Sequence, residues 1–207
     1  MLNRRTFSST VALAALTASV QQVQAATATV GQAAPDFTAI DAVGKSHKLS
    51  DFKGKHVVLE WTNPGCPFVV KHYSGNMQAL QSEFVAKGVV WLSINSTATN
   101  ASDYLAPARL MAWKTEKKAA PTAMLMDESG KIGQLYSAKT TPHMYIINPQ
   151  GMLVYAGAID SVPSARVDDI KTATNYIRQG LNEALGGKPI STSSTRAYGC
   201  SVKYKDA

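Results

Sequence analysis

A valine-rich apolar run that leads into a cysteine–proline pair is the feature that most constrains how this chain can fold. Residues 56–61 are nearly continuously apolar, which predicts a central strand buried on both faces of a sheet. Apolar side chains then recur at helical spacing over residues 67–87 and predict a helix. Because proline is favoured at the first helical position, we expect Cys66, directly before Pro67, at the helix N-cap.

Strands and helices alternate along the rest of the chain. Hydrophobic patterning predicts strands at 89–95 and 122–126, helical segments at 101–118 and 164–185, and a late strand pair at 143–148 and 153–158. A turn at Gly44-Lys45 predicts an earlier hairpin of two short strands. The pattern as a whole predicts an α/β fold, with a mixed central sheet flanked by helices and an N-terminal β-hairpin extension.

The first 25 residues carry the pattern of a secretory signal peptide. Arg4 and Arg5 supply positive charge, residues 11–20 form a short apolar run, and residues 23–25 resemble a cleavage site. The paired arginines also fit a twin-arginine signal, although plain charge in that region would serve an ordinary signal equally well. The apolar run is too short to span a membrane. We therefore expect cleavage before Ala26, export to the periplasm and no stable membrane insertion.

Charge and cysteine content narrow the function classes. The formal net charge is +7, and +5 remains once the two arginines of the signal are removed. This charge is scattered without a basic run, which favours solubility and argues against a nucleic-acid partner. The two cysteines, Cys66 and Cys200, do not form a C-x-x-C pair. A chain of this size folds without disulfides, so two cysteines in an oxidising compartment favour chemistry over a structural role.

The expected position of Cys66 would make it a nucleophile. Unpaired backbone N–H groups and the helix dipole at an N-cap favour negative charge, and the thiolate is the reactive form of cysteine. The alternative is a buried, inert cysteine. A second signal is Thr141-Pro142, which directly precedes the strand at 143–148. Proline there either begins the strand or forms a special turn, and a cis peptide bond is the specific form considered.

Several segments, taken together, resemble the thioredoxin superfamily and, more narrowly, its peroxiredoxin-like (alkyl hydroperoxide reductase/thiol-specific antioxidant) and exported thioredoxin-like branch. These segments are Ala34-Pro35-Asp36-Phe37, residues 49–55, residues 57–61, Cys66-Pro67 and Ala138-x-x-Thr141-Pro142. The resemblance covers about residues 30–185 and depends on the order and spacing of the motifs. It implies a thioredoxin-like fold for residues 26–185, followed by a C-terminal tail, residues 186–207, that carries Cys200.

The resemblance also implies roles for individual residues. Cys66 matches the nucleophilic or peroxidatic cysteine, and Pro142 matches the cis-proline that faces it. The backbone of Thr141 would pair with an extended thiol substrate. Glu60 lies at the spacing of a buried acid that assists proton transfer; a partly exposed strand residue is the alternative.

Two departures from the family patterns stand beside Cys66. Val69 occupies the position of the second thioredoxin cysteine, and Asn63 and Leu59 replace the threonine and proline of the peroxiredoxin pattern P-x-x-x-T-x-x-C. Cys200 offers a resolving thiol instead, with intermolecular pairing or a free thiol as alternatives. The polar segment 186–198 predicts a flexible tail, whereas the aromatic residues around Cys200 favour docking on the domain.

Other candidate residues are weaker. We expect His72 at the surface or partly buried, pointing away from the N-cap. His143 follows the proline, so it is either an acid–base helper for Cys66 or a packed strand residue. Lys71 and Arg109 would supply positive charge to a thiolate, although most such side chains are solvated. The methionines at 77, 111, 124, 126 and 144 fit a role as core fillers better than a copper site.

The leading hypothesis is an exported thiol oxidoreductase in which Cys66 attacks a peroxide or a protein disulfide and Cys200 resolves the product. The resemblance of the N-terminal half to the peroxiredoxin-like branch favours peroxidase-like, antioxidant chemistry slightly over protein disulfide exchange. An external thiol would be the reductant, and no cofactor motif for haem, nucleotide, zinc, flavin or nicotinamide is visible. The alternatives are a copper-binding chaperone and a non-catalytic domain with a structural disulfide. Related domains often pair, so a homodimer is one arrangement the resemblance allows.

Overall fold

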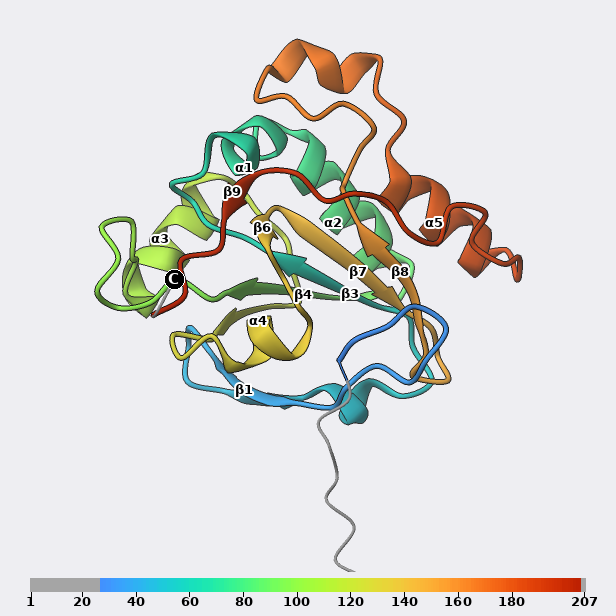
Figure 1. The fold of residues 1–207 in the computed structure, drawn as a ribbon, viewed down its shortest axis with the longest axis horizontal. Helices are drawn as coiled ribbons and strands as arrows, with labels where there is room; N and C mark the ends of the chain where they lie inside the picture. The colour runs from blue at the N-terminus through green and yellow to red at the C-terminus, as the bar shows by residue number, and fades with distance from the viewer. Residues whose placement is uncertain (1–26, 206–207) are drawn as a thin grey trace, which may run out of the picture.

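The computed structural model describes residues 27–205, so the expected signal peptide lies outside the described part of the chain. Its main sheet has seven strands in the order β2-β1-β5-β4-β3-β7-β8 (Figure 1). The strands are β1 (Thr38–Asp41), β2 (Ser46–Lys48), β3 (Val57–Trp61), β4 (Val90–Asn95), β5 (Ala123–Met126), β7 (His143–Ile147) and β8 (Leu153–Gly157). Strands β3, β4 and β5 are parallel, and the other neighbouring pairs are antiparallel. The expected mixed sheet with an N-terminal hairpin is confirmed.

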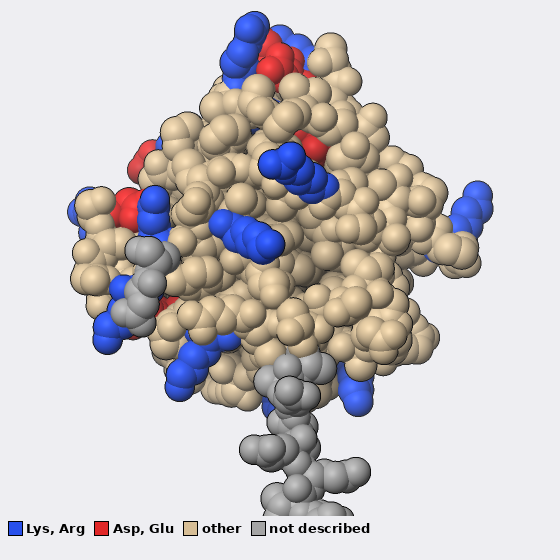
Figure 2. Space-filling model, viewed as in Figure 1, with Lys and Arg blue, Asp and Glu red and all other residues tan. Residues whose placement is uncertain are grey.

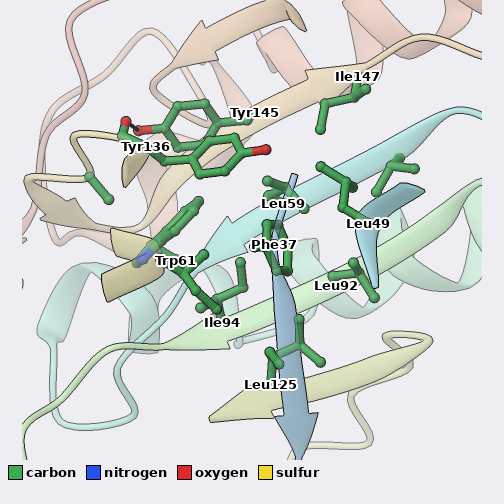
Figure 3. Packing of buried hydrophobic residues seen from close by; sticks show 14 of the residues in the cluster. Phe37, Leu49, Leu59, Trp61, Leu92, Ile94, Leu125, Tyr136, Tyr145 and Ile147 are labelled. Carbon is green, nitrogen blue, oxygen red and sulfur yellow. Dashed lines mark hydrogen bonds between the residues drawn. The ribbon is translucent and has the colours of Figure 1, made fainter. Parts of the chain in front are cut away.

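Alternation along β3 separates two apolar cores. Leu59 and Trp61 face one cluster, to which Phe37 and Tyr136 also belong, and Figure 3 shows these side chains meeting beneath the central strands. Val58 faces the other cluster, which the helices cover. These helices are α1 (Pro67–His72), α2 (Asn76–Ala86) and α5 (Tyr176–Leu185). A buried strand between two layers explains why residues 56–61 are apolar at nearly every position.

Two predicted helices are shorter or divided. The segment 67–87 forms α1 and α2, which are separated near Gly75, where φ is +135°. That backbone angle interrupts a helix and is accessible mainly to glycine. The segment 164–185 contains a 3-10 helix, η2 (Val167–Lys171), and then α5, whose N-cap Asn175 accepts a hydrogen bond from the Arg178 N–H. Apolar spacing alone does not reveal these breaks, because the same side chains still face the core.

The other short elements complete the layers. Within the predicted helical segment 101–118, helix α3 (Pro107–Glu116) begins at Pro107, in keeping with the preference of proline for the first helical turn. Residues 49–52 form a 3-10 helix, η1 (Leu49–Phe52), and α4 (Lys131–Leu135) follows the turn after β5. No helix within residues 27–205 is long and apolar enough to cross a membrane.

The C-terminal segment lies on the domain, contrary to the flexibility expected from its polar composition. In Figure 1 it runs back from α5 across the sheet edge to β9 (Cys200–Ser201), beside α1. There β9 pairs in antiparallel fashion with β6 (Thr140–Thr141). On the face shown in Figure 2, lysine and arginine side chains stand apart from one another, which agrees with the scattered charge of the sequence.

Truncation of the central strand should destabilise the fold strongly. Leu59 is fully buried, so Leu59→Ala is expected to lower the free energy of unfolding by about 2–5 kcal/mol, through lost burial and the cavity left behind. Ile40→Ala, at a position that is 51% exposed, is the control and should cost less than about 1 kcal/mol. Urea unfolding measures both, and equal losses would contradict this assignment of the core.

Candidate active site

Cys66 occupies the N-cap of α1, as the sequence predicts. Its φ and ψ of −82° and 124° are extended, and Pro67 takes the first helical position. The side chain is 2% exposed, and its thiol donates a hydrogen bond of 3.0 Å to the carbonyl oxygen of Thr141. The end of β3 and the start of α1 therefore hold the sulfur against the strand that precedes Pro142.

The Thr141–Pro142 peptide bond is cis, which confirms that part of the prediction. Thr141 ends β6 and is buried, and Pro142 separates β6 from β7. The hydroxyl oxygen of Thr141 is buried without a hydrogen-bond partner among the described residues. The backbone of Thr141 meets both cysteines, since its carbonyl accepts from Cys66 and it lies opposite Cys200 in the β6–β9 pair.

Cys200 therefore lies beside Cys66, although the two are far apart in the sequence. Both are free thiols, and both pack against the same apolar cluster. The pKa of Cys200 is raised to about 12, mainly by burial and in addition by a hydrogen bond to Cys66 and the electrostatic interaction with it. Cys200 thus keeps its proton at neutral pH.

Gly199 allows the tail to approach the cis-proline strand. Its φ is +142°, and a Cβ atom at this position would lie 2.0 Å from the carbonyl oxygen of Thr141. Any side chain would push the backbone of β9 away from β6. A glycine directly before Cys200 is therefore a requirement of the contact between the tail and the site.

Glu60 is fully buried beneath the site, as the resemblance implied. Its carboxylate accepts hydrogen bonds from the side chains of Tyr73 (2.6 Å), Trp91 (2.7 Å), Ser93 (2.8 Å) and Gln81 (3.1 Å). Burial raises the pKa of Glu60, and these donors partly oppose that shift. Neither cysteine is among its hydrogen-bond partners, so a part in proton transfer is left as a proposal.

Asn63 stands where the peroxiredoxin pattern has threonine, and its side chain is fully engaged. The amide nitrogen donates to Asp103 (2.8 Å) and to Thr97 (3.3 Å), and the amide oxygen accepts from the Gly65 N–H (2.8 Å). Its backbone carbonyl accepts from the Cys66 N–H. Asn63 thus shapes the loop that presents Cys66, and its side chain makes no hydrogen bond to the sulfur.

The expectations for Lys71 and His72 were wrong. Both side chains are buried, because Asp160 and Tyr198 provide partners for them. Asp160 and Tyr198 were not singled out together with them, since 89 residues separate Lys71 from Asp160 and 127 separate it from Tyr198. The one sequence feature that pointed to this contact was the aromatic character of the residues around Cys200, which favours docking of the tail on the domain.

The remaining candidates are packed or exposed. Burial lowers the pKa of His143 to about 4, and its Nδ1 lies 3.2 Å from the hydroxyl of Tyr145. Arg109 is exposed on α3. Met77, Met124 and Met144 are buried in the core, as expected of fillers. Within residues 27–205, no group of three or more histidine, cysteine or acidic residues gathers as a metal site.

Comparisons with known proteins point to one family. Residues 30–156 match the model of the AhpC/TSA family. The thiol-disulfide oxidoreductase ResA of Bacillus thuringiensis subsp. konkukian is 27% identical over 125 residues, which cover 60% of this chain and 67% of that protein.

Solved structures agree on the fold. A hypothetical protein of Sinorhizobium meliloti 1021 has a TM-score of 0.77 at 24% identity and covers 88% of this chain and 98% of its own. An uncharacterized conserved protein from Geobacillus kaustophilus has a TM-score of 0.71 at 26% identity, with coverage of 86% and 94%. The fold that this chain shares with these two proteins thus extends beyond residues 30–156 to most of the chain.

Substitution of Gly199 should release the tail from the site. In Gly199→Ala, the Cβ clash with Thr141 is expected to raise the alkylation rate of reduced Cys200 by at least about tenfold, which corresponds to about 1.4 kcal/mol of docking free energy. Gly187→Ala is the matched control, since its φ is also positive (+72°) but no atom lies within 4 Å of the added Cβ. Mass spectrometry after timed iodoacetamide labelling measures both rates, and equal rates would rule out close docking at Gly199.

Glu60 should make stability fall as pH rises. The pKa of Glu60 is raised in the folded state, so on titration the unfolded chain loses this proton at lower pH than the folded protein does. The contribution of protonated Glu60 to the free energy of unfolding is therefore full below about pH 4.5 and decreases as the pH rises to the folded-state pKa. Compared with Glu60→Gln, the wild type should lose up to about 1.4 kcal/mol per pH unit in this window. Urea unfolding between about pH 5 and pH 8 measures the difference.

The glutamine variant suits this test because the site can accommodate it. Its amide oxygen can accept from Trp91, Ser93 and Gln81, and its amide nitrogen can donate to the Tyr73 hydroxyl once that group rotates. Parallel stability profiles for wild type and variant would show that Glu60 does not have a raised pKa.

Proposed function

The chain belongs to the AhpC/TSA family, and we propose that it is a two-cysteine thiol oxidoreductase that reduces a small hydroperoxide. Cys66 is the attacking thiol in this proposal, and Cys200 is the resolving thiol. Thr141 and Pro142 hold the two sulfur atoms together, and Glu60 is the buried acid behind them.

The observation that carries the proposal is the juxtaposition of the two thiols across the backbone of Thr141. Cys66 donates to the Thr141 carbonyl, and Cys200 pairs with the same residue in the β6–β9 ladder. Gly199 permits this close pairing, since a Cβ atom there would clash with the Thr141 carbonyl. The pairing supports a cycle between a dithiol and a Cys66–Cys200 disulfide.

The reaction balances with these two groups and an external reductant. The Cys66 thiolate attacks one oxygen of the hydroperoxide, the O–O bond breaks, and an alcohol leaves with Cys66 as a sulfenic acid. The Cys200 thiol then attacks the oxidised sulfur, which forms the disulfide and releases water. A dithiol donor reduces the disulfide by exchange and is itself oxidised to a disulfide.

Access to Cys66 favours a small oxidant. Cys66 is 2% exposed and the tail covers it, so a hydroperoxide can reach its sulfur with less rearrangement than a protein chain. The raised pKa of Cys200 keeps this thiol protonated in the reduced protein, so Cys66 is the thiol that attacks first in this proposal. Asn63 replaces the threonine of the family pattern, and its amide is hydrogen-bonded to Thr97 and Asp103. In this proposal, therefore, the side chain at position 63 does not activate the oxidant.

Exchange with a protein disulfide is the second candidate. It is favoured by the similarity to ResA, whose name describes a thiol-disulfide oxidoreductase. The backbone of β6 already pairs with an extended cysteine-containing segment, which a substrate strand would have to replace. We further propose that the protein works outside the cytoplasm, on the strength of its first 25 residues.

Peroxide titration of the reduced protein tests the proposal. Wild type should form a Cys66–Cys200 disulfide with one equivalent of hydrogen peroxide, more than about 100-fold faster than free cysteine, the lower end of what a positioned group contributes. Cys200→Ser should stop at oxidised Cys66, and Cys66→Ser should not react at an enhanced rate. Stopped-flow measurements and disulfide mapping by mass spectrometry follow each step.

Two outcomes would overturn the peroxide assignment. One is oxidation of Cys66 no faster than that of free cysteine. The other is faster oxidation by a disulfide-containing peptide, with a Cys66–peptide mixed disulfide accumulating in Cys200→Ser; this result would establish protein disulfide exchange instead.

A further inference from the structure

A buried polar cluster anchors the tail two residues before Cys200. We call it the Tyr198 clasp: the hydroxyl of Tyr198 together with the side chains of Lys71, His72 and Asp160. The Tyr198 hydroxyl donates to Asp160 Oδ1, and it lies 3.4 Å from Lys71 Nζ and 3.2 Å from His72 Nε2. No part of the proposed reaction uses these four residues directly.

Every polar group of the clasp has a partner. Lys71 Nζ donates to Asp160 Oδ2 (3.2 Å), to the carbonyl oxygen of Val162 (3.1 Å) and to Tyr198. Asp160 Oδ1 also accepts from the Val162 N–H (3.0 Å). Burial lowers the pKa of His72 to about 4, so its ring is neutral, and a proton on Nε2 matches the acceptor it meets on Tyr198.

The burial of these charges makes the clasp unusual. The side chains of Lys71 and Asp160 are 0% and 2% exposed. Removing two charges from water costs more than a single pair regains unless further hydrogen bonds satisfy them, and here the tail supplies two of those bonds, one to each charged group. The Tyr198 hydroxyl therefore fills a place between buried groups that the rest of the domain leaves incomplete.

The clasp and the nucleophile share one short helix. Cys66 is the N-cap of α1, and Lys71 and His72 lie in its last turn. Phe68, between them, contacts the Tyr198 ring edge-on at a centroid distance of 5.8 Å. The tail thus runs along α1 from its C-terminal end towards Cys66, with Tyr198 and Cys200 at opposite ends of the contact.

We propose that the Tyr198 clasp is a positioning device that sets Cys200 beside Cys66 for disulfide closure. The inference rests on the proposed function, because it concerns the resolving step. Thr195 is hydrogen-bonded to the Ala156 carbonyl and the Ala158 N–H, so Tyr198 anchors the last stretch of the tail before Cys200. Without that anchor, this stretch would let Cys200 sample more positions, and its effective concentration at Cys66 would fall. The clasp removes that freedom before the oxidant arrives. Closure of the Cys66–Cys200 disulfide competes with a second oxidation, in which another peroxide converts the Cys66 sulfenic acid to sulfinic acid and leaves as an alcohol. A tail that is already docked favours closure in this competition.

The Tyr198→Phe variant tests the clasp, because it keeps the ring and removes only the hydroxyl. The rate of Cys66 oxidation by hydrogen peroxide should stay within about twofold of wild type, while disulfide closure slows by at least about tenfold, as expected for loss of hydrogen bonds to charged groups. Sulfinic acid at Cys66 should rise accordingly. A purely structural role would not separate the two steps.

Tyr204→Phe is the matched control. Tyr204 lies on the other side of Cys200 in the same tail, and its hydroxyl donates one hydrogen bond of 2.7 Å to the Ala138 carbonyl. Closure in this variant should remain within about twofold of wild type, because a single neutral hydrogen bond contributes little net stability. Equal slowing in both variants would overturn the clasp as the positioning element.

A second variant guards against misfolding. Phe68 is only partly buried, so Phe68→Leu should fold while it loses the edge contact with Tyr198, and closure should again slow relative to the first step. Unchanged closure in both Tyr198→Phe and Phe68→Leu would refute the proposal.

Alkylation separates failure of the clasp from failure of the proposed function. In a Cys66→Ser background no disulfide can form, and Tyr198→Phe should raise iodoacetamide labelling of Cys200 by at least about fivefold over Tyr204→Phe, on the same hydrogen-bond argument. If wild type forms no Cys66–Cys200 disulfide but this labelling difference appears, the proposed function fails and the anchoring stands. If labelling is unchanged, the clasp does not hold the tail.

Discussion

The pairing of β9 with β6 is the contact on which the site depends. It brings Cys200 opposite Thr141, whose carbonyl oxygen accepts a hydrogen bond from the Cys66 thiol. Two residues of each strand form the pair, too few to be stable alone, so it needs support from both sides. Gly199 permits the approach, Tyr198 fixes the tail before it, and Tyr204 fixes the tail after it.

Two buried polar networks lie on either side of the site and obey the same constraint. Glu60 is satisfied by four donors from β3's neighbours and the helices, and the Lys71–Asp160 pair is satisfied by backbone carbonyl, backbone amide and tyrosine hydroxyl. Charged groups in an apolar layer are tolerated only with full hydrogen bonding. The networks differ in one respect: the first is complete within the domain, whereas the second includes the tail.

Local patterns in the sequence predicted the parts of the site that local physics determines. The apolar run at 56–61 and the proline after Cys66 were enough to place Cys66 at a helix start. The cis-proline that faces it followed from the family resemblance. Glu60 followed from its spacing in the family resemblance. Sequence reasoning failed where the partners are distant in the sequence. Lys71 and His72 are residue types usually found at the surface, and their burial depends on Asp160 and on the tail.

Packing inside the domain also explains why the second thiol is in the tail. Val69, at the position of the second thioredoxin cysteine, is fully buried and packs in the helix-covered core, so this position is used for packing. The residue that meets Cys66 instead approaches over the Thr141 side, where β6 offers an edge with which another strand can pair. A strand carried by the tail meets that need, and it brings a thiol whose raised pKa keeps it protonated at neutral pH. In the proposed cycle, separating the two thiols between the domain and its tail makes resolution depend on docking, and docking depends on residues remote from the sulfur chemistry.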